Sequence, residues 1–123
     1  MEFVETVDKI VFDRNEVQHN MTRKDKILQK LYNIQKRPSM YIRKHKEYDI
    51  LCSFMEGWLL GLTVESHENN YLWGTAKYFA GIHDCGSSIS LSLLIDMKYP
   101  QMSSEEKCSK YIQTIIDYFE NTE

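Results

Sequence analysis

Three cysteines and four histidines are the residues most suited to chemistry, as nucleophiles or as metal ligands. They are Cys52, Cys85 and Cys108, and His19, His45, His67 and His83. Their spacing forms neither a CxxC pair nor an HExxH motif, which are patterns that hold zinc. No nucleophile stands in a recognisable pattern with a base, and the glycine-serine run at residues 86–88 lacks the lysine of a phosphate-binding loop. The sequence therefore predicts a protein that is not an enzyme and that uses no metal or cofactor.

Charge is divided between two parts of the chain, although the net charge is only −3 over 123 residues. Residues 22–46 hold nine basic residues against Asp25 alone, whereas from residue 65 onward nine acidic residues stand against four lysines. A charge distribution of this kind can steer a charged partner to one side of the molecule. It also suits two solvated faces with no specific role, and the sequence leaves both interpretations open.

The most hydrophobic stretch is residues 34–62, which joins a basic turn around Pro38 to a helix expected from about Tyr48 to Glu65. Apolar residues at intervals of three and four predict its buried face. They are Leu51, Phe54, Met55, Trp58 and Leu62, widened by Leu59 and Leu60. We expect this helix to be central and buried over more than half its circumference. Gly57 and Gly61 weaken a helix, so a second helix is expected to approach closely there.

Four further helices are expected around this one. A capping box at Thr22–Asp25 opens a helix that ends near Lys36, and its buried face is Ile27, Leu28, Leu31 and Ile34. An aromatic helix at 71–83, capped by Asn69 or Asn70, is expected to bury Leu72, Ala76, Phe79 and Ile82. For residues 88–95 a helix capped by Ser87 or Ser88 is favoured over a strand. A second capping box at Ser103–Glu106 opens a final helix with Cys108, Tyr111, Ile112, Ile115 and Phe119 on one face.

Residues 1–21 form a separate N-terminal extension in this interpretation, and residues 22–123 form the helical domain. The spacing of Phe3, Val7, Ile10 and Val11 suits a helix, while residues 9–12 alternatively suit a short strand. The predicted fold class is mostly α, a compact single-domain bundle of about five helices with a short N-terminal strand or extension. The start of the chain lacks signal-peptide features and no apolar run could span a bilayer, so a cytoplasmic protein is expected.

The segment Lys36-Arg37-Pro38-Ser39-Met40-Tyr41-Ile42 carries a resemblance to a known family. An RPxMY turn after a basic helix, Phe54 and Gly57 in an FxxG spacing, and an aromatic helix with Lys77-Tyr78 follow in the same order. Together they resemble small all-α bacterial immunity proteins encoded beside contact-dependent or polymorphic toxins, over residues 22–120. The same turn also resembles a KRPGMYIG segment of gyrase B type ATPases, but Ser39 and Arg43 replace both glycines of that segment.

The resemblance implies a function: the chain would bind one cognate toxin domain, for example a nuclease, and block it without any catalytic residue of its own. Because nucleic-acid-cutting toxins tend to be basic at their active sites, carboxylates are the expected partner-binding groups. The candidates are Glu65, Glu68, Asp84, Asp96, Glu105 and Glu106. The alternative is a small nucleic-acid-binding module that uses the basic segment 22–46 against phosphates. No membrane partner is expected, and the sequence leaves the oligomeric state open.

Overall fold

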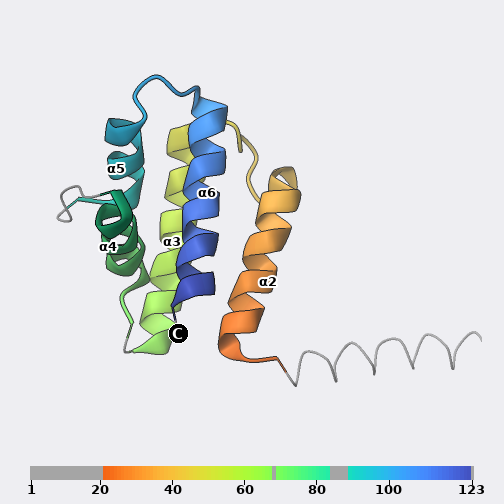
Figure 1. The fold of residues 1–123 in the computed structure, drawn as a ribbon. Coiled ribbons are helices and arrows are strands. Elements are labelled where there is room, and N and C mark those ends of the chain that lie inside the picture. Colours follow the sequence, from red (N-terminus) through yellow and green to blue (C-terminus); the bar gives the residue numbers. More distant parts are fainter. Residues whose placement is uncertain (1–20, 68, 84–88, 123) are drawn as a thin grey trace, which may run out of the picture.

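The computed structural model describes residues 21–67, 69–83 and 89–122, and these ranges form five α-helices and one 3-10 turn (Figure 1). In chain order they are α2 (Arg23–Lys36), η1 (Pro38–Met40), α3 (Tyr48–Ser66), α4 (Tyr71–His83), α5 (Leu91–Lys98) and α6 (Ser104–Asn121). The predicted all-α fold class is confirmed. The expected N-terminal strand or extension falls on residues 1–20, outside the described ranges.

Helix α6 is the element on which the others are assembled, because it packs against α2, α3, α4 and α5. In Figure 1, α3 and α6 lie in the middle of the molecule, α2 lies on one side of them, and α4 and α5 lie on the other. The expected apolar face of this last helix is confirmed. Its buried residues are Cys108, Tyr111, Ile112, Thr114, Ile115, Ile116 and Phe119. The helix expected at 48–65 therefore shares the central place with α6 (Figure 1), which contacts more of the other helices.

Both predicted capping boxes are present and fix where α2 and α6 begin. The Thr22 hydroxyl accepts from the Asp25 amide at 3.1 Å, and the Asp25 carboxylate accepts from the Thr22 amide in return. Ser103 and Glu106 exchange the same two bonds at 3.1 and 3.2 Å. Each box satisfies amides that the first turn of a helix otherwise leaves without partners.

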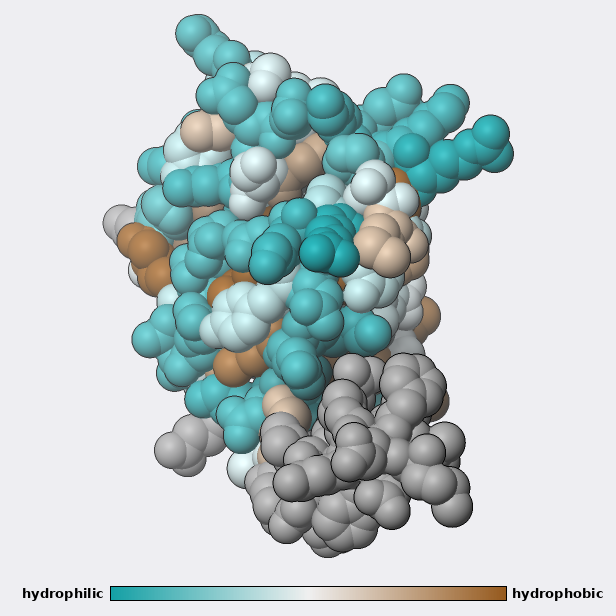
Figure 2. Space-filling model, turned by 90° about the vertical axis from the view of Figure 1, so that its right-hand side faces the viewer, coloured by the Kyte–Doolittle hydropathy of each residue, from teal (hydrophilic) through white to brown (hydrophobic). Residues whose placement is uncertain are grey.

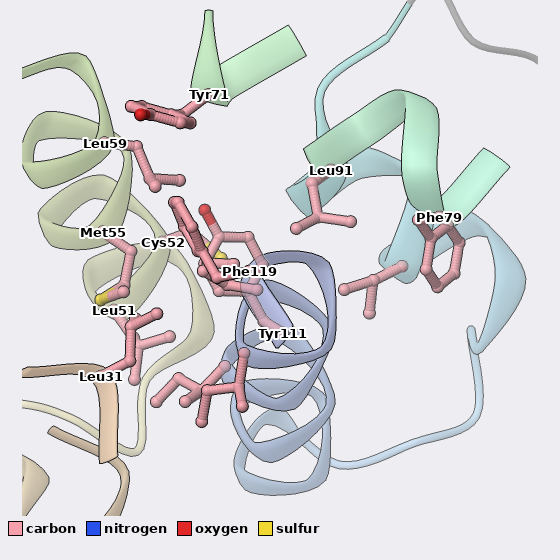
Figure 3. Packing of buried hydrophobic residues seen from close by; sticks show 14 of the residues in the cluster. Leu31, Leu51, Cys52, Met55, Leu59, Tyr71, Phe79, Leu91, Tyr111 and Phe119 are labelled. Carbon is pink, nitrogen blue, oxygen red and sulfur yellow. The ribbon is translucent and has the colours of Figure 1, made fainter. Parts of the chain in front are cut away.

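The core is one apolar cluster shared by all five helices (Figure 3). Helix α2 contributes the predicted residues Ile27, Leu28, Leu31 and Ile34. From α3 and α4, Met55 and Phe79 are almost fully buried, and Tyr111 of α6 stands edge-on to Tyr48 at 6.1 Å between ring centroids. The described cysteines, Cys52 and Cys108, lie inside this cluster as small apolar side chains.

Helix α3 buries a narrower face than its sequence suggested. Its buried residues are Leu51, Cys52, Met55 and Leu59, while Trp58 and Leu62 are only half-buried. Leu60 is 51% exposed and Phe54 37% exposed, so both expected core positions were wrong. The helix packs on α4 and α6 from one side. Residues on its outer side remain apolar without being buried, which is why periodicity alone overestimated the buried face.

The two glycines of α3 also differ from expectation. A side-chain Cβ placed at Gly57 or Gly61 would meet no atom within 4 Å, so no described helix approaches α3 there. Gly74 in α4 is the glycine that a neighbour does approach, because a Cβ at this position would lie 2.5 Å from the Tyr118 hydroxyl. Close packing at a glycine therefore occurs between α4 and α6.

Helices α4 and α5 also differ in detail from the sequence-based interpretation. Ile82 is exposed, and Tyr71, Thr75 and Ala80 are buried beside the predicted Ala76 and Phe79. Asn70 caps α4 as expected, accepting from the Trp73 amide at 3.1 Å. The helix favoured over a strand after residue 88 is confirmed from Leu91. Its cap is Ser90 rather than Ser87 or Ser88, and those two serines lie outside the described residues.

The open surroundings of Gly57 and Gly61 predict that alanine is tolerated at both positions. Gly57→Ala and Gly61→Ala should each raise the free energy of unfolding by about 1 kcal/mol, because alanine restricts the unfolded chain and favours the helix. Gly74→Ala is the matched control and should be neutral or destabilising, since Tyr118 must move. Urea unfolding followed by circular dichroism measures all three. Destabilisation by the α3 substitutions would mean that something covers this face.

Candidate functional site

The predicted partner-binding carboxylates that the structure describes lie on three different helices. Glu65 lies at the end of α3, whereas Glu105 and Glu106 lie in the first turn of α6, at the opposite end of the bundle (Figure 1). Asp96 lies on α5. Glu68 and Asp84 are outside the described residues. Among the four described candidates, Glu65 is therefore separated from Glu105 and Glu106 by the length of the bundle.

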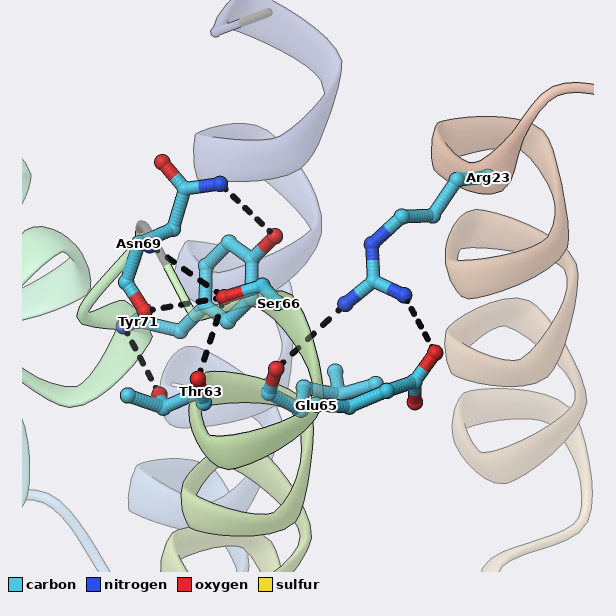
Figure 4. A network of polar contacts seen from close by, with 7 residues as sticks. Arg23, Thr63, Glu65, Ser66, Asn69 and Tyr71 are labelled. Carbon is cyan, nitrogen blue, oxygen red and sulfur yellow. Dashed lines mark hydrogen bonds and ion pairs between the residues drawn. The ribbon is translucent and has the colours of Figure 1, made fainter.

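Each of the four described candidates has a contact within the chain. Glu65 Oε1 forms an ion pair with Arg23 Nη1 at 2.7 Å, and Arg23 Nη2 donates to the Leu62 carbonyl at 3.3 Å (Figure 4). Asp96 pairs with Lys107, and Glu105 lies 3.8 Å from Lys46. Glu106 is committed to its capping box. The division of charge seen in the sequence is thus partly cancelled locally, because Arg23 and Lys46 meet acidic residues from the other half.

A different set of carboxylates does come together, in a groove between α3 and α5 with a volume of about 420 Å³. We call it the α3–α5 groove. It is lined by Tyr48, Asp49, Cys52, Ser53, Glu56, Ser90, Ser92, Leu93 and Asp96. Asp49 and Asp96 are exposed at its surface, and Glu56 is half-buried. Three carboxylates therefore line one open groove, and one of them, Asp96, is paired with Lys107.

Hydrogen bonds fix the walls of this groove. The Tyr48 hydroxyl donates to the Ser92 carbonyl at 2.6 Å and so ties α3 to α5. The Ser92 hydroxyl donates to Glu56 Oε1 at 3.4 Å, which orients that carboxylate. Lys107 lies 6.0 Å from the centre of the Tyr48 ring while it pairs with Asp96. The acidic groups are held by rigid helices, as a preorganised binding surface requires.

An apolar hollow adjoins the groove and shares Glu56 and Ser90 with it. This Trp73 hollow has a volume of about 310 Å³. Its other lining residues are Leu59, Asn70, Leu72, Trp73, Thr75, Ala76, Ile89, Leu91 and Tyr111. Trp73 is 54% exposed at its edge and carries Lys77 over its ring at 4.5 Å. Together the groove and the hollow place carboxylates beside an exposed aromatic ring, a combination typical of protein-binding surfaces.

The sequence contained a signal for this groove that its analysis missed. Asp49, Ser53 and Glu56 follow one another at intervals of four and three, so they share one side of α3. Ser92 and Asp96 are four apart on α5 in the same way. The predicted set contained neither Asp49 nor Glu56. Only Asp96 was included in the predicted set and also lines the groove.

The described cysteines are poor nucleophiles in this environment. Burial raises the pKa of the Cys52 thiol to about 12 and that of Cys108 to about 11. Both thiols therefore stay protonated at neutral pH, where the thiolate is the reactive form. Among the described residues, no three His, Cys, Asp or Glu side chains are arranged to hold a metal ion. The α3–α5 groove and the Trp73 hollow therefore suit binding through charged groups and apolar surface.

Comparison with known proteins adds no family to these observations. A scan of protein-family models and searches of curated proteins and of solved structures found no match. None of the helices that the structure describes is long and apolar enough to cross a membrane.

The raised thiol pKa values lead to a prediction about reactivity. In a Cys85→Ser variant at about pH 8, iodoacetamide should leave Cys52 and Cys108 unmodified in the folded protein, because both are buried and protonated. After the protein is unfolded by denaturant, iodoacetamide should alkylate both cysteines at the rate of an exposed free cysteine. Mass spectrometry of tryptic peptides measures the modified fraction at each position. Rapid alkylation of Cys52 without denaturant would contradict its placement in the core.

Proposed function

We propose that this chain is a non-catalytic, immunity-type inhibitor that binds a cognate toxin domain through the α3–α5 groove and the adjoining Trp73 hollow. The observation that carries the proposal is the convergence of Asp49, Glu56 and Asp96 on one concave surface beside an exposed Trp73. The resemblance around the RPxMY turn supports a toxin as the partner. The proposed partner is therefore a basic protein surface.

The carboxylates would serve association and orientation. Exposed acidic groups attract a basic partner over several ångströms and raise the association rate, an effect that salt reduces. Glu56 is half-buried at the junction of groove and hollow, so a basic side chain reaching it would be removed from water. A charge pair of this kind contributes more to specificity than pairs at the edge of an interface.

The apolar surface would supply much of the binding free energy. Trp73 stands at the edge of its hollow, and Leu93 of α5 is 45% exposed in the groove. Aromatic side chains beside a pocket often dominate the energetics of an interface, while the surrounding polar residues set orientation. The two adjoining hollows thus contain the two kinds of contact that a tight protein inhibitor needs.

The nucleic-acid alternative has less support from the described contacts. Arg23 of the basic segment is ion-paired with Glu65, and Lys46 lies 3.8 Å from Glu105. Two of the nine basic groups are thus close to carboxylates that phosphates would have to displace. The remaining lysines and arginines still allow a salt-dependent test of this alternative.

The proposal predicts that neutralising the groove weakens capture of the toxin. The tagged chain is co-expressed with the open reading frames that neighbour its gene in the native host, and the bound partner is quantified. Asp49→Asn with Glu56→Gln should weaken binding by about tenfold or more, mainly through slower association at low salt. Biolayer interferometry gives the rate constants, and growth rescue in co-expressing cells gives the biological readout.

The matched control removes the same charge elsewhere. Glu105→Gln with Glu120→Gln lies outside both hollows, and glutamine at 120 can still accept the hydrogen bond from Tyr32. This variant should bind and rescue like the unaltered chain, and thermal melts check that both proteins fold. Equal loss in the two variants would show that net charge matters rather than the groove. Recovery of nucleic acid alone, lost at high salt, would favour the basic segment.

A further inference from the structure

A second open groove lies on the other side of α3, facing α2. Helix α2 packs on α6, and the space left between α2 and α3 has a volume of about 440 Å³. We call it the α2–α3 groove, and it is lined by Arg23, Lys26, Ile27, Lys30, Trp58, Leu62 and Glu65. Figure 2 views the molecule from the α2 side, where hydrophilic residues predominate and apolar patches show between them.

This groove combines basic groups with an apolar floor. Lys26 and Lys30 are exposed on α2, and Arg23 is held at one end by Glu65. Trp58 and Leu62 of α3 remain only half-buried within it. A half-buried tryptophan flanked by lysines suits an occupant that presents apolar side chains together with carboxylates.

Residues 2–12 of the same chain have this chemistry. Phe3, Val7, Ile10 and Val11 fall on one side of a helical repeat. The acidic residues Glu2, Glu5 and Asp8 alternate with them. Over residues 1–20 there are five acidic residues against Lys9 and Arg14, which gives the segment the charge opposite to that of α2.

The connection of the chain also favours this occupant over a separate molecule. Residues 1–20 lead directly into Thr22 and Arg23, and Arg23 lines the end of the groove. An 11-residue helix is about 16 Å long, enough to cover the roughly 10 Å of α2 from Arg23 to Lys30. Residues 13–20 are available to reverse the chain direction. Such a short connection gives residues 2–12 an effective concentration of about millimolar at the α2–α3 groove. Even weak binding to the groove would then keep it occupied.

We propose that residues 2–12 dock as an amphipathic helix in the α2–α3 groove, with their apolar side against Trp58 and their carboxylates near Lys26 and Lys30. The docked segment covers the basic groups of α2 that line this groove and leaves the α3–α5 groove open. The inference is independent of the proposed function, since it concerns the other flank of α3 and requires no toxin.

Trp58 reports on the docking in the full-length chain. The protein has two tryptophans, and Trp73→Phe leaves Trp58 as the only one. In this background, Val7→Ser with Ile10→Ser should shift the Trp58 emission to longer wavelength and increase its quenching by acrylamide. Phe12→Ser is the control, because residue 12 lies on the opposite side of a helix from Val7. It should leave emission and quenching unchanged.

A charge exchange separates docking from a general loss of stability. Lys26→Glu with Lys30→Glu should expose Trp58 as the serine variant does, and adding Glu5→Lys with Asp8→Lys should restore protection. Unchanged Trp58 emission in the serine variant, or no recovery in the exchanged chain, would overturn the proposal. So would protection that disappears on dilution together with a dimer in light scattering, because the occupant would then be a second copy.

Discussion

The burial of one face of α6 is the interaction on which the rest of the structure depends. Four helices place their apolar sides on this face, and Ile115 and Tyr111 are almost inaccessible to solvent there. The Tyr111 phenol is buried in this contact, which raises its pKa well above the ordinary value. Because α3 and α5 both pack on α6, the distance between them is fixed by the core. The α3–α5 groove therefore follows from core packing, and the hydrogen bond from the Tyr48 hydroxyl to the Ser92 carbonyl adds a direct link between its walls.

Ion pairs then join parts of the chain that differ in charge. Arg23 and Glu65 link α2 to the end of α3, and Lys46 lies near Glu105 across the turn that follows η1. These pairs are exposed, so each contributes little to stability. Their effect is on the electric field: they remove Glu65 and Glu105 from the set of unpaired carboxylates. Among the described residues, Asp49 and Glu56 of α3 form no ion pair, so they remain as unpaired carboxylates of the α3–α5 groove, where Asp96 is paired with Lys107.

Local signals made much of this fold predictable. The capping boxes at Thr22 and Ser103 involve residues three apart, so no tertiary information was needed to place the starts of α2 and α6. The final helix was also predictable, because its apolar residues occupy one side and its charged residues the other. Helix α3 was misjudged because Phe54 and Leu60 are apolar yet exposed. The amino-acid type at those positions does not indicate which side faces the core.

The candidate site was less accessible from sequence, since it is formed by residues of different helices. Asp49 and Glu56 could be grouped by their spacing, but their approach to Asp96 depends on how α5 packs beside α3. Likewise, nothing local distinguished Gly74, which Tyr118 contacts, from Gly57, which faces open space. Contacts of this kind depend on the angles between packed helices, which the order of residues in a single chain does not specify.

Helix α3 separates two surfaces of opposite charge, and this separation connects the two proposals. Asp49 and Glu56 lie on its α5 side, and Trp58 and Leu62 lie on its α2 side. If residues 2–12 dock as proposed, their carboxylates would offset Lys26 and Lys30, and these lysines would repel a basic partner less. The carboxylates of the α3–α5 groove would then dominate the electrostatic attraction of a basic partner, which would speed its association. Under the two proposals together, a segment bound on one side of α3 would favour association on the other side through charge alone.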